Sequence, residues 1–502
     1  MTLFHKLKNS KIAWKIKAVR RASELRELRK KLNRFKLYSD KRRQELEQEV
    51  HLLKYENASL KTTARTNKLP ALSVASFVEI RTLCILLVIS GIVSFRSVPR
   101  ILRVCQLFGA SHVQIPHFTS VIHWVLRSGV AIFSQVSTIH GSWIAIIDCS
   151  IDIGTRKALV VLRVSLAALE NRKGAICLQD CECIGLKISS TWNGTLVSDA
   201  LKEVFSISGQ PIAILKDGGT DLNKGVQLYR ESEPAKQIMI LDDVGHVTAN
   251  ALKAEFAEQI SFVKFLNIIR KGAARIRQTD LAWLLPPKIR TKGRFQGITE
   301  VADWATKILS TMGGQGRAQE NSELSRLRKA FSGLPKLRDF LSRFCGACET
   351  TELFLKIIKQ TGLNQETYKA AKNIILQLPE KSITQVRLLS WLDKHLYIQC
   401  KMGIGQTPLL TSSDVLESLF GKFKTVVQRN PQAELNRLVY VIPLLCGFRS
   451  KEQIASAVKS CSHNQILNEI EKTIPQTLRQ QRHRVLERGK PETGNLNLKR
   501  TG

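Results

Sequence analysis

The spacing of hydrophobic and polar residues changes along this chain, and the changes divide it into regions. Between residues 141 and 241, short apolar runs separated by turn residues indicate strands. The predicted strands are Trp143–Asp148, Ala158–Val164, Ile184–Ser190, Pro211–Leu215 and Gln237–Leu241. Helical spacing separates the later ones, over Leu196–Phe205 and Asp221–Tyr229. Strands joined by short links and then alternating with helices predict a mixed α/β sheet.

Strand patterns nearly disappear from residue 245 to residue 405. This stretch has helical spacing with breaks at Pro286-Pro287, Gly313-Gly314 and Pro379, which predicts an all-α insertion. Helical patterns return from about residue 412 to 480, and a Gln- and Arg-rich tail that we expect to be disordered follows. The predicted divisions are 141–245 and 406–480 for the two parts of the sheet core, 246–405 for the insertion and 481–502 for the tail.

Residues 1–68 lack proline and glycine and have a helical pattern. Apolar residues recur there at spacings of three and four, in two groups: Leu25, Leu28, Leu32 and Phe35, then Leu46, Val50, Leu53 and Leu60 with Asn57 at a core position. This heptad seam predicts a coiled coil in which a core asparagine fixes the register. A solvated helix that does not dimerise explains the pattern about as well.

Residues 75–135 have the pattern of successive short helices. Ser97-Val98-Pro99-Arg100 predicts one helix start, and Ile115 to Ser120 predicts another. Gly129 is expected to end the second helix. A late, well-capped helix of this kind is typical of a helix-turn-helix that binds DNA, with Arg100, Trp124 and Arg127 as candidate contacts. A plain helical bundle is the alternative.

The overall charge narrows the classes of partner. The chain has 77 Lys and Arg against 42 Asp and Glu, a net charge of 77 − 42 = +35. The first 68 residues contribute 20 − 7 = +13 of it. Such a charge favours an acidic partner, most commonly nucleic acid, with an anionic lipid surface as the alternative.

Two membrane interpretations fail. Met1 to Arg21 has no apolar core, so it is not a signal peptide. The most apolar run, Thr82–Phe95, lies between two arginines and falls short of the roughly 20 residues that a spanning helix needs. We expect this run to be a buried helix.

Cysteine usage favours a reduced, intracellular protein. The count of 11 is odd, and neither the lone Cys345-Gly-Ala-Cys348 pair nor the group Cys177, Cys181 and Cys183 has a second ligand pair at zinc-finger spacing. We expect ordinary buried thiols.

Three acids stand at positions that matter for chemistry. Asp148 ends one predicted strand, Asp217 directly follows another, and Glu417 lies near a predicted helix start that Asp414 is expected to cap. Carboxylates at strand ends and a helix start can meet at one edge of a sheet. Hard oxygen ligands suit Mg²⁺ or Mn²⁺, and two such ions support in-line phosphoryl displacement.

The order of these acids resembles that of DDE transposases, which have an RNase H-like catalytic core. The segments that carry the resemblance are Ile147 to Ser150, Leu215 to Gly225 and Ser413 to Lys422. The resemblance covers about residues 75–445. It implies an α/β RNase H-like mixed sheet core with a large all-α insertion, preceded by an all-α coiled-coil and helix-turn-helix region. Asp148, Asp217 and Glu417 would then be the catalytic residues and the ligands of two Mg²⁺ or Mn²⁺ ions.

A finer resemblance follows the second acid. Asp243-Val244-Gly245-His246 is similar to the signature found at this place in hAT-type transposases and the V(D)J recombinase, which implies accessory roles for Asp243 and His246. Asp242 could replace Asp243 in such a role. Alternatively, His246 only caps or packs on its own helix.

Several residues are candidates for contacts with DNA in and beyond the insertion. Insertions in such enzymes often present an aromatic residue to a flipped base, for which Trp304 is the candidate, although a tryptophan in the core is the commoner case. The cations that could contact phosphates are Arg290, Lys292 and Arg294 in the insertion, and Lys422 and Lys424 after Glu417. Solvated charged faces are the alternative.

The sequence therefore predicts a DNA transposase that binds element ends and joins DNA strands with two metal ions. We expect DNA as partner, a homodimer or higher oligomer, no membrane, and a cytoplasmic, nucleoid-associated location in a bacterium. Two other classes stay open, namely a catalytically inactive or domesticated DNA-binding protein and an RNase H-fold nuclease without strand transfer.

Overall fold

The computed structural model describes most of the chain beyond residue 76. The described residues are 77–108, 114–149, 156–232, 235–289, 295–313, 316, 318–427, 435–447, 449–473, 483 and 486, with scattered positions between 14 and 50. The chain divides into two units, residues 1–74 and 75–502. In the first unit, the described positions between Trp14 and Val50 are helical. Leu25, Leu28, Leu32 and Val50 of the predicted seam are exposed there, whereas Phe35, Leu46, Leu53, Asn57 and Leu60 lie outside the described residues.

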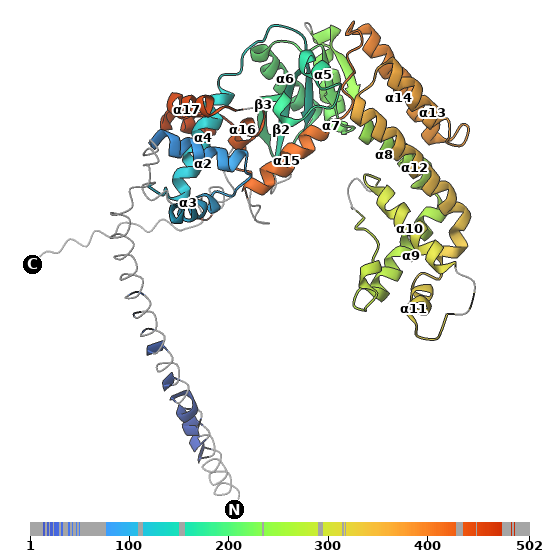
Figure 1. The fold of residues 1–502 in the computed structure, drawn as a ribbon, viewed down its shortest axis with the longest axis horizontal. Helices are drawn as coiled ribbons and strands as arrows, with labels where there is room; N and C mark the ends of the chain where they lie inside the picture. The colour runs from blue at the N-terminus through green and yellow to red at the C-terminus, as the bar shows by residue number, and fades with distance from the viewer. Residues whose placement is uncertain are drawn as a thin grey trace, which may run out of the picture. The chain divides into compact units, whose positions relative to one another are not determined.

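A mixed sheet of five strands forms the centre of the second unit (Figure 1). Its strands lie in the order β3-β2-β1-β4-β5. The strands β1, β2 and β3 are antiparallel neighbours, whereas β4 and β5 run parallel to β1. Their bounds are β1 Trp143–Asp148, β2 Lys157–Ser165, β3 Cys181–Ser189, β4 Ala213–Lys216 and β5 Met239–Asp242. The predicted mixed α/β sheet is thus confirmed, and its edges differ from the prediction by only a few residues.

Alternation along the strands produces two cores, one on each face of the sheet. Ala145 and Ile147 of β1 pack with the helices α6 (Gly194–Ser208) and α7 (Thr220–Arg230). Ile144 and Ile146 face the opposite core, which continues into the rest of the unit. By the same alternation, Asp148 belongs to this second face. The short elements α5 (Leu166–Asn171), η1 (Leu178–Asp180) and η2 (Ala235–Gln237) join the strands.

The described residues from 246 to 405 contain helices and no strand. Figure 1 shows α9, α10 and α11 grouped at the end of the long helix α12. The bounds are α8 Val244–Phe256, α9 Ile260–Ile276, η3 Ala282–Leu284, α10 Ile298–Met312, α11 Glu323–Ala330, η4 Leu334–Leu337, α12 Arg338–Thr361, α13 Gln365–Ile375 and α14 Ile383–Lys401. A cluster of phenylalanine rings, including Phe262, Phe265, Phe340 and Phe344, holds α9 against α12.

The helices before and after the sheet core pack into one module. α4 (Phe118–Phe133) packs against α2 (Phe77–Ile89) and also against the C-terminal helices. The other members are α3 Ser97–Leu107, η5 Arg437–Val441, α16 Ile442–Leu445, α17 Lys451–Ser460 and α18 His463–Thr473. The boundaries drawn at 75–135 and 406–480 therefore cut through one packed module, because contacts between chain segments this far apart leave no local pattern.

Gly129 continues α4 and does not end it. A Cβ atom at this position would lie 1.9 Å from the Tyr440 carbonyl oxygen. The glycine therefore allows α4 and η5 to touch, and the prediction that it stops the helix is wrong. Of the run Thr82–Phe95, which was expected to be one buried helix, the first part to Ile89 lies in α2 with Ile85 and Val88 fully buried, and the rest follows the end of that helix. Among the described residues, no helix is long and apolar enough to span a bilayer.

Candidate active site

Asp148 and Asp217 lie at the carboxyl ends of two adjacent parallel strands. Ile147 of β1 is in register with Lys216 of β4, so the next residues in each strand direction, Asp148 and Asp217, stand at the same level. From this edge, β1 connects to β2 on one side, while β4 connects to β5 on the other. The two connections thus leave neighbouring strand ends in opposite directions. Such a reversal leaves a crevice outside the strand ends, which is where open α/β sheets bind ligands.

Local hydrogen bonds orient both carboxylates. The Cys149 N–H donates to Asp148 Oδ1 at 2.6 Å, and the Gly219 N–H donates to Asp217 Oδ1 at 2.8 Å. Burial, together with the charges of Asp148 and Asp217, raises the pKa of the Cys149 thiol. Cys149 is therefore a protonated, neutral group next to Asp148.

Glu417 lies on α15 (Asp414–Val427), which packs beside β1. Asp414 is the first residue of this helix, and its carboxylate accepts two hydrogen bonds from Lys359 of α12 at 2.7 and 2.8 Å. The prediction that Asp414 caps the helix is wrong, since Ser412 Oγ accepts the Asp414 N–H and the lysine takes the carboxylate. Apolar residues such as Leu416 and Leu419 bury one face of α15 and leave Glu417 exposed.

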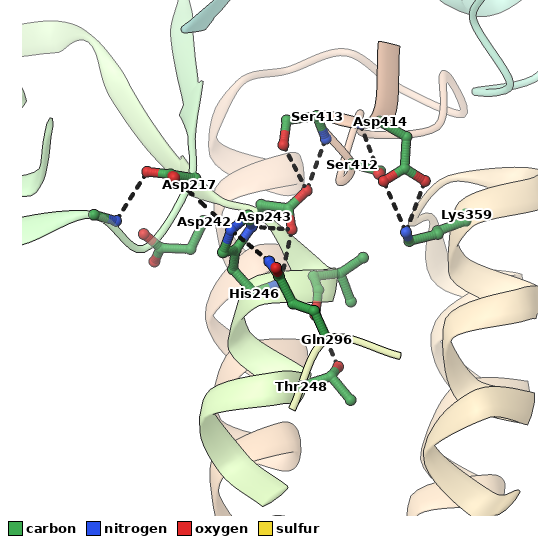
Figure 2. Close-up of polar contacts among 12 residues, drawn as sticks. Asp217, Asp242, Asp243, His246, Thr248, Gln296, Lys359, Ser412, Ser413 and Asp414 are labelled. Carbon is green, nitrogen blue, oxygen red and sulfur yellow. Dashed lines mark hydrogen bonds and ion pairs between the residues drawn. The ribbon is translucent and has the colours of Figure 1, made fainter. Parts of the chain in front are cut away.

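Asp243 ties the start of α8 to the start of α15 (Figure 2). Its Oδ1 accepts the His246 backbone N–H at 2.8 Å and lies 3.0 Å from His246 Nδ1. Its Oδ2 accepts the Ser413 N–H at 2.7 Å and the Ser413 hydroxyl at 3.0 Å. Burial alone would raise the pKa of Asp243, but the bonds from His246 and Ser413 outweigh burial and lower it. The carboxylate is thus fully used within the protein and fixes the helix that carries Glu417.

His246 bridges this clamp and the sheet edge. Its Nε2 lies 3.8 Å from Asp217 Oδ2 and 2.8 Å from the Gln296 side-chain nitrogen. With Nδ1–H donated to Asp243, Nε2 accepts from Gln296. The hydrogen bond to Asp243 raises the pKa of His246 against the effect of burial, and the charges of Asp217 and Asp148 add to this. His246 therefore makes specific contacts beyond its own helix.

Asp242 has a different task from Asp243. Its carboxylate pairs with Lys216 at 2.6 Å and with Lys394 of α14 at 2.7 Å. Burial opposes ionisation, but these two lysines lower the pKa of Asp242 to about 2. Its backbone N–H donates to His395 Nε2, and its carbonyl accepts the Trp391 indole N–H. Asp242 therefore anchors α14 to β5 and does not occupy the place of Asp243.

Sequence reasoning missed the partners that hold this edge together: Lys216, Ser413, Gln296, Lys394 and His395. Only Lys216 left a local signal, because it is a charged residue at the end of an apolar strand and is 4% exposed. The others act across more than 40 intervening residues, as with Gln296 and His246, which are separated by 50 positions.

A cavity of about 240 Å³ lies beside these residues. Its lining includes Asp243, His246, Gln296, Lys359 and Glu417. Glu417 thus opens into the space next to the histidine that contacts Asp217. Within the described residues, no group of three or more His, Cys, Asp or Glu side chains stands in an arrangement that could hold a metal ion.

The remaining predicted DNA contacts have varied positions. Trp304 is half-buried, packs edge-on against Phe331 and donates its indole N–H to the Leu284 carbonyl oxygen, so it belongs to the helical core. Trp124 is 8% exposed in the core of the helical module, where it cannot reach a base.

The cations differ in exposure. Arg127 donates to the Cys461 carbonyl oxygen, whereas Arg100 and Lys422 are exposed and Lys424 is half-buried. Arg290, Lys292 and Arg294 lie outside the described residues. The cysteines are free thiols: Cys181, Cys183, Cys345 and Cys348 are buried and Cys177 is exposed.

The similarity of this chain to known proteins lies in its structure. No family model and no curated protein matches this sequence. Among solved structures, the chain is similar to the Drosophila P element transposase strand transfer complex, with 12% sequence identity and a TM-score of 0.38. The match covers 82% of this chain and 99% of that chain.

Proposed function

We propose that this protein is a transposase that cleaves DNA strands and transfers them in a metal-dependent reaction, and that its sheet is an RNase H-like catalytic core. The observation that carries the proposal is the placement of Asp148 and Asp217 at one level of two adjacent parallel strand ends, with Glu417 opening into the neighbouring cavity. This edge lies at the reversal point of the sheet, where ligand sites form.

The three residue types fit divalent metal ions, although as placed the described side chains do not form a ready group of three ligands. All three are carboxylates, which are the oxygen ligands that Mg²⁺ and Mn²⁺ prefer. Asp217 uses Oδ1 for the Gly219 N–H, whereas its Oδ2 accepts no hydrogen bond from a described residue. We propose that Asp148, Asp217 and Glu417 hold two such ions. When bound, the ions would activate the attacking water or 3′-hydroxyl and stabilise the leaving oxygen.

The protein's own residues position these acids. Asp243 fixes the first turn of α15, and therefore the backbone from which Glu417 extends, through both hydrogen bonds to Ser413. His246 places a nitrogen 3.8 Å from Asp217, with its ring held from the far side by Asp243. We therefore propose that Asp243 and His246 are positioning residues.

The basic charge of the chain supplies the attraction to DNA. A net charge of +35 on 502 residues favours phosphate contacts, and its effect on binding should weaken with salt. We propose that the N-terminal helix and the helical module around α4 bind element ends, with Arg100 and Lys422 among the exposed cations. Joining two element ends requires two such DNA-binding surfaces, so we propose a dimer or larger assembly.

The test is strand nicking by purified full-length protein. Labelled duplexes taken from the genomic DNA on either side of the coding sequence are incubated with Mg²⁺ or Mn²⁺ and resolved on denaturing gels. The wild type should nick at defined positions and produce joined strands. Asp217→Asn should lose at least about 10³-fold in rate, since it removes a ligand of the reacting centre.

Asp199→Asn is the matched control, because Asp199 is an exposed carboxylate on α6, across the sheet from Asp148. Nicking that survives Asp217→Asn would overturn the assignment of the site. Metal-dependent nicking without joined products would identify a nuclease, and salt-sensitive binding without nicking would identify a DNA-binding protein that lacks catalysis.

A further inference from the structure

A groove of about 510 Å³ lies along α9 in the insertion, and none of its lining residues belongs to the acidic edge. The segment that leaves η3 forms its other wall. Its lining residues are Leu266, Ile269, Arg270, Ala273, Arg277, Leu285, Pro286, Pro287, Lys288 and Ile289. The groove thus has an apolar floor with cations around it, and no acid lines it.

The three cations of this groove have no partner within the described part of the chain. Arg270, Arg277 and Lys288 are exposed, and none makes an ion pair or a hydrogen bond with a described residue. Neighbouring arginines are used differently. Arg275 donates to the carbonyl oxygens of Lys329 and Ala330, and Arg326 forms two hydrogen bonds with Asp280. The groove is therefore a place where positive charge is kept available for an external anion.

An exposed tryptophan stands next to one wall of the groove in the sequence. Trp283 of η3 is 73% exposed, and Leu285, two residues later, lines the groove. The other tryptophan of this region, Trp304, is packed against Phe331 and bonded to Leu284. An aromatic side chain this exposed, two residues before the basic and apolar stretch that lines the groove, is suited to stacking on nucleobases.

We propose that this groove binds a short stretch of unpaired DNA. Arg270, Arg277 and Lys288 would contact phosphates, while the apolar floor and Trp283 would receive bases. A duplex would present only its phosphates to the floor, because its bases are stacked and paired, so the apolar lining favours a single strand. The inference rests on the proposed function, since unpaired nucleotides arise where an enzyme opens DNA ends.

The sequence beyond the groove is consistent with this occupant. Ile289 is the last lining residue, and the chain continues directly into the segment that carries Arg290, Lys292 and Arg294. No acid stands between Leu285 and Gln296 in the sequence, so this part of the chain carries only positive charge.

The experiment measures binding in EDTA by fluorescence anisotropy, with full-length protein. The probes are a labelled oligothymidylate of about 20 nucleotides and a labelled duplex of the same length. The triple variant Arg270→Gln/Arg277→Gln/Lys288→Gln is compared with a matched variant, Lys253→Gln/Lys264→Gln/Lys271→Gln, which removes the same charge from exposed positions of α8 and α9 outside the groove.

The groove variant should bind the single strand about 10-fold more weakly than the matched variant. The slope of its affinity against salt should fall by about 2, because each phosphate that no longer meets a cation removes roughly 0.7. Trp283→Ala should weaken single-strand binding at least about 5-fold, and Trp283→Phe should restore most of it. Duplex binding should change equally in the two triple variants.

Equal single-strand affinity of the two triple variants, or an unchanged affinity in Trp283→Ala, would overturn the proposal. A larger effect on the duplex than on the single strand would also overturn it, in favour of a duplex contact. Because the assay contains no metal, Asp217→Asn should bind the oligonucleotide at least as tightly as the wild type. The binding assay therefore tests the groove, and the nicking assay tests the catalytic assignment. Either proposal can fail while the other one holds.

Discussion

The ends of β4 and β5 carry acids at equivalent positions, and the protein uses them in opposite ways. After β5, Asp243 accepts hydrogen bonds at both oxygens and Asp242 is paired with two lysines. After β4, Asp217 accepts a hydrogen bond from the Gly219 N–H and from no other described residue, and its second oxygen lies 3.8 Å from His246. One strand end has satisfied its carboxylates internally, while the other has kept an oxygen accessible.

This difference separates structural acids from candidate metal ligands. A carboxylate whose acceptor sites are all filled by buried donors has no capacity left for an external ligand, and removing it leaves those donors unpaired. An acid with an unbonded oxygen at the crevice has little structural role to lose. The two strand ends should therefore respond in opposite ways to the same substitution.

The largest expected change in stability follows the replacement Asp243→Asn. The new amide NH₂ would face either the two donors of Ser413 or those of His246, so unfolding should become easier by about 3 kcal/mol. Asp217→Asn should change stability by less than about 0.5 kcal/mol, because its amide oxygen can still accept the Gly219 N–H. Urea unfolding monitored by circular dichroism gives both values, and similar losses would break the comparison.

Acid should destabilise the β5 end through His395. This histidine is fully buried, and burial lowers its pKa from 6.5 to about 4. Between these two values the unfolded chain binds the proton that the folded chain excludes, so stability is complete above pH 6.5 and falls as the pH drops toward 4. At pH 5 we expect a loss of about 2 kcal/mol relative to pH 7.

Urea midpoints from pH 7 down to pH 5 test this expectation. His395→Gln should lower stability at pH 7 and flatten the dependence on pH. A wild-type stability that stays constant over this range would show that His395 is not held neutral.

A smaller effect is expected from Ser413→Ala. The hydroxyl donor to Asp243 is lost but the backbone donor remains, so the expected cost is about 1 kcal/mol. A double-mutant cycle with Asp243→Asn should show clear coupling, because both changes act on one hydrogen-bonded contact. Additive effects of the two substitutions would separate Ser413 from the clamp.

The smallest effect concerns the ion pair between Lys359 and Asp414. Both side chains are partly exposed, at 31% and 53%, so water and salt screen their attraction. Lys359→Gln should change the unfolding free energy by at most about 0.5 kcal/mol, and that change should shrink further at high salt. A loss comparable to that of Asp243→Asn would show that α12, and not the aspartate clamp, holds the start of α15.

Local patterns predicted most of the secondary structure. The apolar runs located the sheet, and helical spacing located the insertion. The same patterns placed Asp148 and Asp217 at strand ends, which structure then put on neighbouring parallel strands. Local patterns could not choose between Asp242 and Asp243. The partners that decide the choice, Lys394 and Ser413, lie more than 150 positions away in the sequence.

Two residues in the helical regions also show that local patterns do not predict packing between distant segments. The sequence offered Trp304 as a possible base contact, yet packing against Phe331 buries much of Trp304, whereas Trp283, which the pattern did not single out, is exposed. Gly129 was expected to end a helix, but the carbonyl of Tyr440 requires a glycine there. Burial and close approach depend on the partner surface, which a local pattern does not contain.

The sequence by itself determined the elements of this protein, its mixed sheet, its helical insertion and its strongly basic charge, because these follow from polarity and spacing over a few neighbouring residues. The tertiary structure alone decided which carboxylates are satisfied, which aromatic ring is exposed, and that the first and last helices form one module. Those outcomes depend on hydrogen bonds and packing between segments far apart in the sequence, by 170 positions for Asp243 and Ser413 and by 334 for Arg127 and Cys461.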